Sequence, residues 1–170
     1  RRSLTMHLFI YYVLTVVGVF SQLPRALGEE PKNVYGQPLQ SCSSPGMALS
    51  GYTRTGYCVN IDDDAGSHHI CIDLSSATGG NFCTVTGQPN WCSSNMACHG
   101  EATAYDGLCP VQDWCVCQWA FARYLERAGG CDHIQDIKCE AVNRQALIAY
   151  GKNDEYREAL ECIERKCGLM

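Results

Sequence analysis

The first apolar segment of the chain is an uncharged run near its N-terminus. Residues 8–20 read LFIYYVLTVVGVF, which is 13 residues. A membrane-spanning helix needs about 20, whereas the core of a secretory signal peptide has this shorter length. The small residues Ala26 and Gly28 predict cleavage after Gly28. We therefore expect residues 1–28 to be a signal peptide, with a short uncleaved anchor as the alternative.

Three later segments have the pattern of short strands. Residues 69–74 alternate, so that Ile70, Ile72 and Leu74 share one face, and alternation of this kind predicts a strand with one buried side. Residues 51–59 are rich in aromatic and β-branched side chains, which predicts a strand or hairpin arm. A third short strand is expected over residues 136–141.

Helical spacing of apolar residues is found in the second half of the chain. Residues 113–128 predict the longest helix, with Asp113 as its cap and Gly129 as its end. A short helix is expected over residues 143–150. Another is expected over residues 153–167, where acidic residues in the first turn and basic residues in the last suit the helix dipole.

The segment 75–110 shows little periodicity. It is rich in Gly, Ser, Thr and Asn and contains Cys83, Cys92, Cys98 and Cys109. A structureless loop of this length is uncommon in a compact domain. We therefore expect disulfides to fasten it to itself or to the core.

Composition adds a compartment and excludes one class of partner. The chain has 170 residues, 13 cysteines and a net charge of −5. Removal of residues 1–28 takes away three arginines and no acids, so the charge of the remaining chain becomes −8. An acidic chain without a basic block argues against nucleic acid as a partner. Many cysteines after a signal peptide predict disulfides, and hence a secreted or secretory-pathway lumenal protein with no stable membrane span after cleavage.

The cysteine spacing limits what these residues can do. The sequence contains no C-x-x-C, which removes the usual oxidoreductase and zinc-knuckle spacings. Because 13 is odd, at least one cysteine lies outside any intrachain bridge. Cys115 and Cys117 would point apart on the helix expected there, so they need different partners. Cys162 and Cys167 are expected to pair outward, with Cys131 and Cys139 as candidates.

Several motifs together resemble a known family. Residues 33–39 (NVYGQPL) before Ser41-Cys42, residues 51–58 (GYTRTGYC), the acidic turn that ends in Asp64-Ala65-Gly66-Ser67-His68, and Trp114-Cys115-Val116-Cys117 occur in the order found in the bacterial family called domain of unknown function 2237. The resemblance extends over about residues 33–150. Together with the predicted elements, it implies a small α+β single domain over residues 29–170. Its parts are short strands, a central W-C-x-C helix and C-terminal helices, the last over residues 151–170, and disulfides reinforce it.

The resemblance also divides the cysteines. Five match the family, and eight do not. The matching five are Cys42, Cys58, Cys71, Cys115 and Cys117. Since eight is even, these eight can close four bridges among themselves, and the unpaired thiol is then expected among the five. Two departures stand out: segment 75–110 is longer and richer in cysteine than in the family, and a family Thr-His appears here as Val142-Asn143.

The residues with candidate chemistry lie near the shared motifs. They are Arg54, Asp64, His68, Cys115 and Cys117. A cysteine nucleophile needs an imidazole nearby to hold it as a thiolate, and His68 could supply one. The alternative is that His68 bonds locally within a turn, Arg54 pairs with the acidic turn, and the cysteines are bridged. The acidic turn at residues 62–64 does not match a calcium loop.

These observations leave two functions open. The first is a non-catalytic binding or structural module with an unknown protein or small ligand as partner. The second is a small hydrolase-like enzyme that uses His68 with a cysteine or an acidic residue. No motif predicts a cofactor or a metal.

Overall fold

Two pairs of short antiparallel strands form the framework of the domain. A computed structural model describes residues 30–98 and 107–170, so the expected signal peptide lies outside the described residues. Strand β1 (Ile70–Asp73) pairs with β4 (Asp113–Val116), with Ile70 opposite Val116 and Cys71 opposite Cys115. Strand β2 (Asn95–Ala97) pairs with β3 (Leu108–Pro110).

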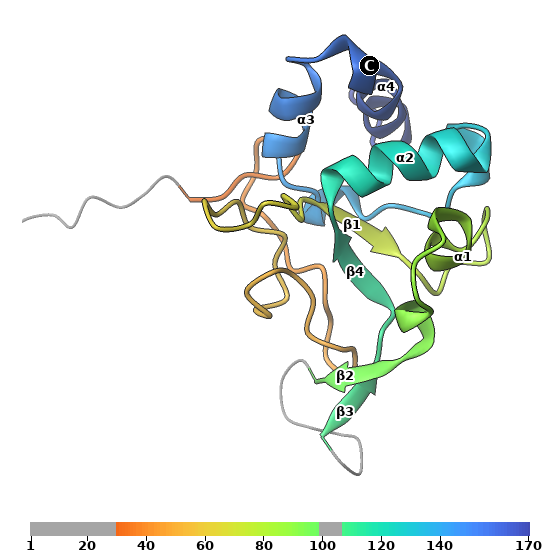
Figure 1. Cartoon of the computed structure of the whole chain (residues 1–170). Helices are drawn as coiled ribbons and strands as arrows, with labels where there is room; N and C mark the ends of the chain where they lie inside the picture. The colour runs from red at the N-terminus through yellow and green to blue at the C-terminus, as the bar shows by residue number, and fades with distance from the viewer. Residues whose placement is uncertain (1–29, 99–106) are drawn as a thin grey trace, which may run out of the picture.

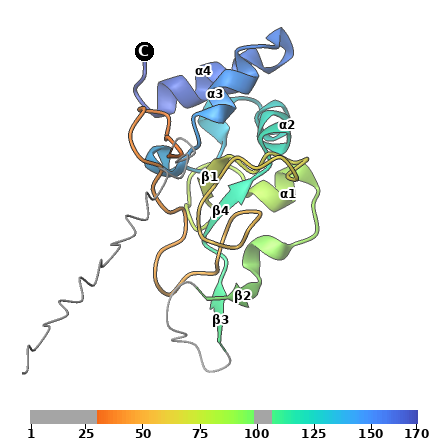
Figure 2. The same cartoon turned by 90° about the vertical axis from the view of Figure 1, so that its left-hand side faces the viewer.

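The helices gather at one end of this framework. Helices α2 (Gln118–Ala128), α3 (Gln145–Tyr150) and α4 (Arg157–Lys166) lie together, whereas the β2–β3 pair forms the opposite end (Figures 1 and 2). The short α1 (Phe82–Thr86) packs against α2. This arrangement is the α+β class that the sequence predicts, with short strands and C-terminal helices.

The predicted start of the longest helix is wrong. Asp113 does not cap a helix; it belongs to strand β4, and α2 begins only after Cys117. Buried cross-strand pairs explain the difference, because Trp114 lies opposite Ile72 and Val116 opposite Ile70. Pairing with β1 buries this segment better than a further helical turn would. The W-C-x-C motif is therefore a strand that leads into a helix.

Two predicted strands are also absent from the described residues. Residues 51–59 form successive bends and turns, in which Gly51, Arg54 and Gly56 all have positive φ. A Cβ on Gly51 would lie 2.3 Å from the Tyr57 carbonyl oxygen, so the tight turn requires glycine there. In residues 136–141, only Ile137 makes a single bridge, to Ile72, and Cys139–Ala141 is a 3₁₀ turn.

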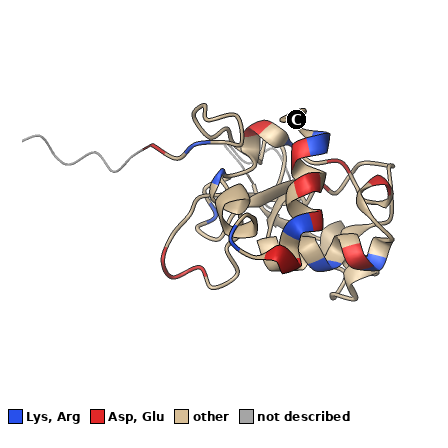
Figure 3. Cartoon of the chain, turned by 90° about the horizontal axis from the view of Figure 1, so that it is seen from above, with Lys and Arg blue, Asp and Glu red and all other residues tan. Residues whose placement is uncertain are grey.

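The C-terminal helices follow the sequence prediction with shifted starts. In α3, Asn143 Oδ1 accepts a hydrogen bond from the Gln145 amide before the first turn. Asn153 Oδ1 accepts from the Glu155 amide, but the first turn is 3₁₀ (Asp154–Tyr156) before α4 begins. Viewed onto this end, acidic and basic residues are interspersed along the helices (Figure 3). Arg165 and Asp132 form one exposed ion pair there, at 3.1 Å.

The main core lies between the β1–β4 pair and the helices. Its largest enclosed side chains include Phe82, Phe121, Tyr124 and Tyr150. Phe121 comes from α2, and Trp114 of β4 is also buried. Trp119 is 37% exposed and lies against Tyr156.

Six disulfides join twelve of the cysteines. The pairs are Cys42–Cys71, Cys58–Cys115, Cys83–Cys92, Cys98–Cys109, Cys131–Cys162 and Cys139–Cys167. The eight cysteines outside the family pattern pair only among themselves, and the free thiol is Cys117, one of the other five. Both results confirm the division made from the sequence. The outward pairing of Cys162 and Cys167 is confirmed as well.

The segment 75–110 is fastened to itself. Cys83–Cys92 closes the part that contains α1, and Cys98–Cys109 closes the β2–β3 pair. In its described part the segment is not structureless, because Phe82 and Cys83 are buried in the main core.

Candidate functional site

The free thiol lies at a strand–helix junction. Cys117 follows the last residue of β4 and is the N-cap of α2, and no side chain makes a capping hydrogen bond there. It is partly exposed. Cys117 therefore combines access with freedom from a disulfide.

An oriented imidazole follows the acidic turn. His68 Nδ1 lies 2.7 Å from Asp64 Oδ1, and Asp64 Oδ2 accepts from the His68 amide at 2.7 Å. Asp64 is buried. Its burial alone would raise the pKa of the carboxyl, but hydrogen bonds from His68 and Gly66 and the charge of His68 lower the pKa overall. With Nδ1 donating to the carboxylate, Nε2 is left as the atom that can accept a proton.

The thiol and the imidazole meet at one small cavity. His68 and Cys117 both line a cavity of about 70 Å³, together with Trp91 and Trp114. The Gln118 amide donates to the Ser67 carbonyl at 3.0 Å, which holds the two chain segments side by side. The structure records no hydrogen bond between the His68 and Cys117 side chains. Catalytic hydrogen bonds are often long before substrate binds, so the arrangement still suits a nucleophile and its base.

Two exposed side chains flank this cavity. The Arg54 guanidinium carbon lies 4.8 Å from the centre of a Trp114 ring. Tyr52 stacks on His68, with ring centres 6.1 Å apart. The alternative in which Arg54 pairs with the acidic turn is wrong, because Arg54 forms no ion pair with any residue that the structure describes. Its turn directs it to the face of Trp114 instead.

Cys115 is removed from the candidate chemistry. It is bonded to Cys58 and buried, and its amide donates to Ser50 Oγ at 2.5 Å. Cys115 and Cys117 were expected to need different partners because they would point apart on one helix. Cys115 pairs with Cys58 and Cys117 is free, and the helix argument does not apply because Cys115 lies in β4.

Sequence analysis missed a second, buried histidine. His69 Nδ1 lies 2.8 Å from Gln118 Oε1, whereas Nε2 is enclosed without a hydrogen-bond partner. Burial lowers the pKa of His69, and the hydrogen bond to Gln118 opposes this only in part. Tyr150 donates from its hydroxyl to the Gln118 carbonyl, and burial raises the pKa of Tyr150 well above its usual range. The adjacent His-His pair was the one signal in the sequence that could have suggested this cluster.

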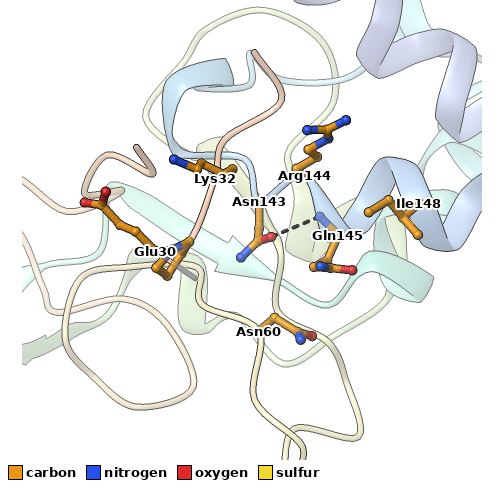
Figure 4. A pocket seen from close by; sticks show the side chains of 8 residues that line it. Glu30, Lys32, Asn60, Asn143, Arg144, Gln145 and Ile148 are labelled. Carbon is orange, nitrogen blue, oxygen red and sulfur yellow. Dashed lines mark hydrogen bonds between the residues drawn. The ribbon is translucent and has the colours of Figure 1, made fainter. Parts of the chain in front are cut away.

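A larger pocket lies on another face, beside α3. Its volume is about 350 Å³, within the range of small-molecule sites. Figure 4 shows Asn143, Gln145 and Asn60 around its centre, whereas the charged ends of Lys32 and Arg144 extend toward its rim. Asn143, the residue that replaces the family histidine in the resemblance above, donates from Nδ2 to the Cys58 carbonyl at 2.9 Å. This pocket contains none of the five candidate residues.

Comparison with known protein families matches residues 32–154 to the family described as "Uncharacterized protein conserved in bacteria (DUF2237)". The chain belongs to this family. The match confirms the resemblance found in the motifs, and DUF2237 carries no assigned reaction. A search of curated proteins finds no match.

The disulfides of this DUF2237 protein indicate its environment. Six bridges suit a chain that matures in an oxidising extracellular or secretory compartment. Within residues 30–98 and 107–170, no helix is long and apolar enough to cross a membrane.

Proposed function

We propose that this DUF2237 protein is a small hydrolase-like enzyme with Cys117 as its nucleophile. One observation carries the proposal. The free Cys117 lines the same cavity as His68, and the His68 ring is oriented by its contact with Asp64. Nucleophile, base and orienting acid are the three parts that cysteine acyl transfer requires. The proposal adopts the second of the two functions left open by the sequence.

The proposed reaction moves one proton between thiol and imidazole. His68 Nε2 takes the proton of the Cys117 thiol, and Sγ attacks the carbonyl carbon of an acyl substrate. The leaving group departs with that proton, which leaves a thioester on Cys117. Water then attacks the thioester with His68 as base, and the acid product leaves while the proton returns to sulfur. Asp64 holds the imidazole in its orientation.

The size of the cavity limits the substrate. About 70 Å³ holds little more than the reacting group, so the remainder of a substrate would lie on the surface near Tyr52 and Arg54. Both side chains are exposed. The exposed Arg54 guanidinium favours substrates with a carboxylate or another anionic group near the acyl carbon.

The test measures the reactivity of Cys117 and its dependence on His68. We expect alkylation of the native protein by iodoacetamide at Cys117 alone, located by peptide mass spectrometry. His68→Ala should slow it by about 10-fold or more, because the base is removed. The exposed His133→Ala is the matched control and should leave the rate unchanged.

Acyl transfer is tested with an activated ester. We expect p-nitrophenyl acetate to give a burst of nitrophenol and an acetyl group on Cys117, both lost in Cys117→Ala. Equal alkylation rates in wild type and His68→Ala, together with no acetyl adduct, would contradict the enzyme proposal.

A binding module is the second candidate, favoured by the 350 Å³ pocket beside α3. Lys32 and Arg144 at its rim would suit a small anion. Titration with acetate and with phosphate should then shift the amide resonances of residues 143–148, and Arg144→Ala should abolish the shifts. An unchanged spectrum with both anions would remove this candidate.

Secretion after cleavage of residues 1–28 is proposed with either function. The support is the apolar run at residues 8–20, together with the six bridges. When the full chain is expressed in a eukaryotic cell line, the protein should be recovered from the culture medium with Glu29 as its N-terminal residue. An intact N-terminus on a membrane-bound product would contradict it.

A further inference from the structure

Two disulfides, each with one cysteine on a strand of the β1–β4 pair, lie close together. The Sγ atoms of Cys42, Cys58 and Cys71 are all within 4.8 Å of one another, and Cys115 Sγ is bonded to that of Cys58. All four residues are at most 1% exposed and form a cluster with Ala141, separate from the main core. Three of these sulfurs therefore lie within 4.8 Å of one another in one enclosed cluster, and that of Cys115 is joined to them through its bond to Cys58.

This convergence matches what a thiolate metal site requires. Structural zinc takes four tetrahedral ligands, often four cysteines, with Zn–S near 2.3 Å. Sulfurs at those corners are about 3.8 Å apart. Opening both bridges lets each bonded pair separate toward that distance, while the contacts between the pairs are already at most 4.8 Å for three of the sulfurs.

Strand pairing and hydrogen bonds hold the backbone around the four sulfurs in addition to the bridges. Cys71 and Cys115 are paired on β1 and β4. The Cys42 amide donates to the Gly56 carbonyl at 2.7 Å, and the Cys58 carbonyl accepts from Asn143. Reduction would therefore leave four thiols held close together, which favours capture of an ion over separation of the loops.

We propose that reduction converts this cluster into a zinc site formed by Cys42, Cys58, Cys71 and Cys115. A dithiol reductant supplies two electrons and two protons to each bridge and becomes a disulfide itself, which gives four thiols. One Zn²⁺ then binds the four sulfurs and releases up to four protons. The same residues thus serve as two disulfides in an oxidising compartment and as a soft-metal site in a reducing one. The inference does not depend on Cys117 or on the proposed enzyme.

The test uses Co²⁺ and Zn²⁺ on protein reduced with tris(2-carboxyethyl)phosphine. Co²⁺ should give the visible bands of a tetrahedral thiolate complex, and Zn²⁺ should displace it at one ion per chain. The paired variant Cys42→Ser/Cys71→Ser should lose the bands and weaken zinc binding by about 100-fold or more. The control variant Cys131→Ser/Cys162→Ser has the same number of thiols and should keep both the visible bands and the zinc affinity of wild type.

A second variant guards against a folding defect. Cys58→Ser/Cys115→Ser should behave like Cys42→Ser/Cys71→Ser, and each protein is checked by its amide spectrum before metal is added. Cys117→Ser should bind zinc as wild type does. Absence of tetrahedral bands in reduced, folded wild type, or equal loss in the Cys131→Ser/Cys162→Ser control, would overturn the proposal.

Discussion

Cys71 and Cys115 occupy opposite positions on β1 and β4, yet they are not bonded to each other. Each is bridged to a loop cysteine, Cys71 to Cys42 and Cys115 to Cys58. The two bridges fasten the long, turn-rich segment before β1 to both strands of the central pair. This segment also carries Arg54 and Asp64, so the bridges fix the chain that supplies part of the candidate site.

The length of the loop that each bridge closes should set how much that bridge contributes to the free energy of unfolding. Cys58–Cys115 spans 57 residues, and Cys83–Cys92 spans 9. Loop-closure entropy predicts losses of about 4 and about 2.5 kcal/mol for the paired alanine variants. Urea denaturation of the two variants measures the difference. A larger loss for Cys83→Ala/Cys92→Ala would show that local packing outweighs chain entropy.

Asn143 should matter for stability far more than its neighbour Gln145. The Asn143→Ala variant leaves the buried Cys58 carbonyl without its donor and the Gln145 amide without its acceptor. We expect a loss of about 2 kcal/mol in the free energy of unfolding. The exposed Gln145→Ala should change it by less than about 0.5 kcal/mol. Thermal unfolding of both variants at one pH tests this, and similar melting temperatures would contradict it.

His69 should make stability depend on pH. Burial lowers the pKa of His69 below its ordinary value of 6.5, so the unfolded chain binds a proton in a range where the folded chain does not. The contribution of His69 to stability is present above pH 6.5 and is lost as the pH falls from there toward the folded pKa. His69→Gln should flatten this part of the profile.

The comparison of wild type with His69→Gln isolates this effect. Burial raises the pKa of Asp113, so that carboxyl changes stability in the opposite direction at lower pH, and it does so in both proteins. Chemical denaturation from pH 5 to pH 8 provides the profiles. The exposed His133→Gln should keep the wild-type slope, and an unchanged slope in His69→Gln would refute the assignment.

The Arg54–Trp114 contact should give a modest, charge-dependent stabilisation. Arg54→Ala is expected to lower the free energy of unfolding by about 0.5–1 kcal/mol, the usual range for an exposed cation–π pair. Arg54→Lys should retain part of it. Both replacements keep a Cβ at the same positive φ, so backbone strain does not separate them. Equal stability of the two variants would show that the charge over Trp114 contributes nothing.

Local sequence signals predicted those parts of the fold that depend on neighbours in the chain. Helix α4 follows from its dipole-matched charges, and β1 from alternation over residues 69–74. These local signals gave the wrong element at residues 113–116, where the apolar spacing fits a helix as well as a strand. There the partner strand β1, 40 residues away along the chain, decides the outcome through buried cross-strand pairs. The turns of residues 51–59 were missed because their aromatic residues suggest a strand.

The candidate site was predictable only as a set of residue types. The motifs brought forward Asp64, His68 and Cys117. The structure places His68 and Cys117 on one cavity, with Asp64 hydrogen-bonded to His68. The sequence had no signal for the stacking of Arg54 on Trp114. It also gave no sign of the enclosed Nε2 of His69, because burial results from packing between distant segments.

The sequence by itself determined that at least one of the 13 cysteines lies outside any intrachain bridge, since the count is odd. Its motifs predicted that this cysteine is among the five shared with the family. Only the tertiary structure decided that it is Cys117 and which cysteines are bonded. A disulfide requires two Cα atoms about 5 to 6 Å apart with suitable direction. That distance arises from strand pairing and loop packing, which residue spacing alone does not specify.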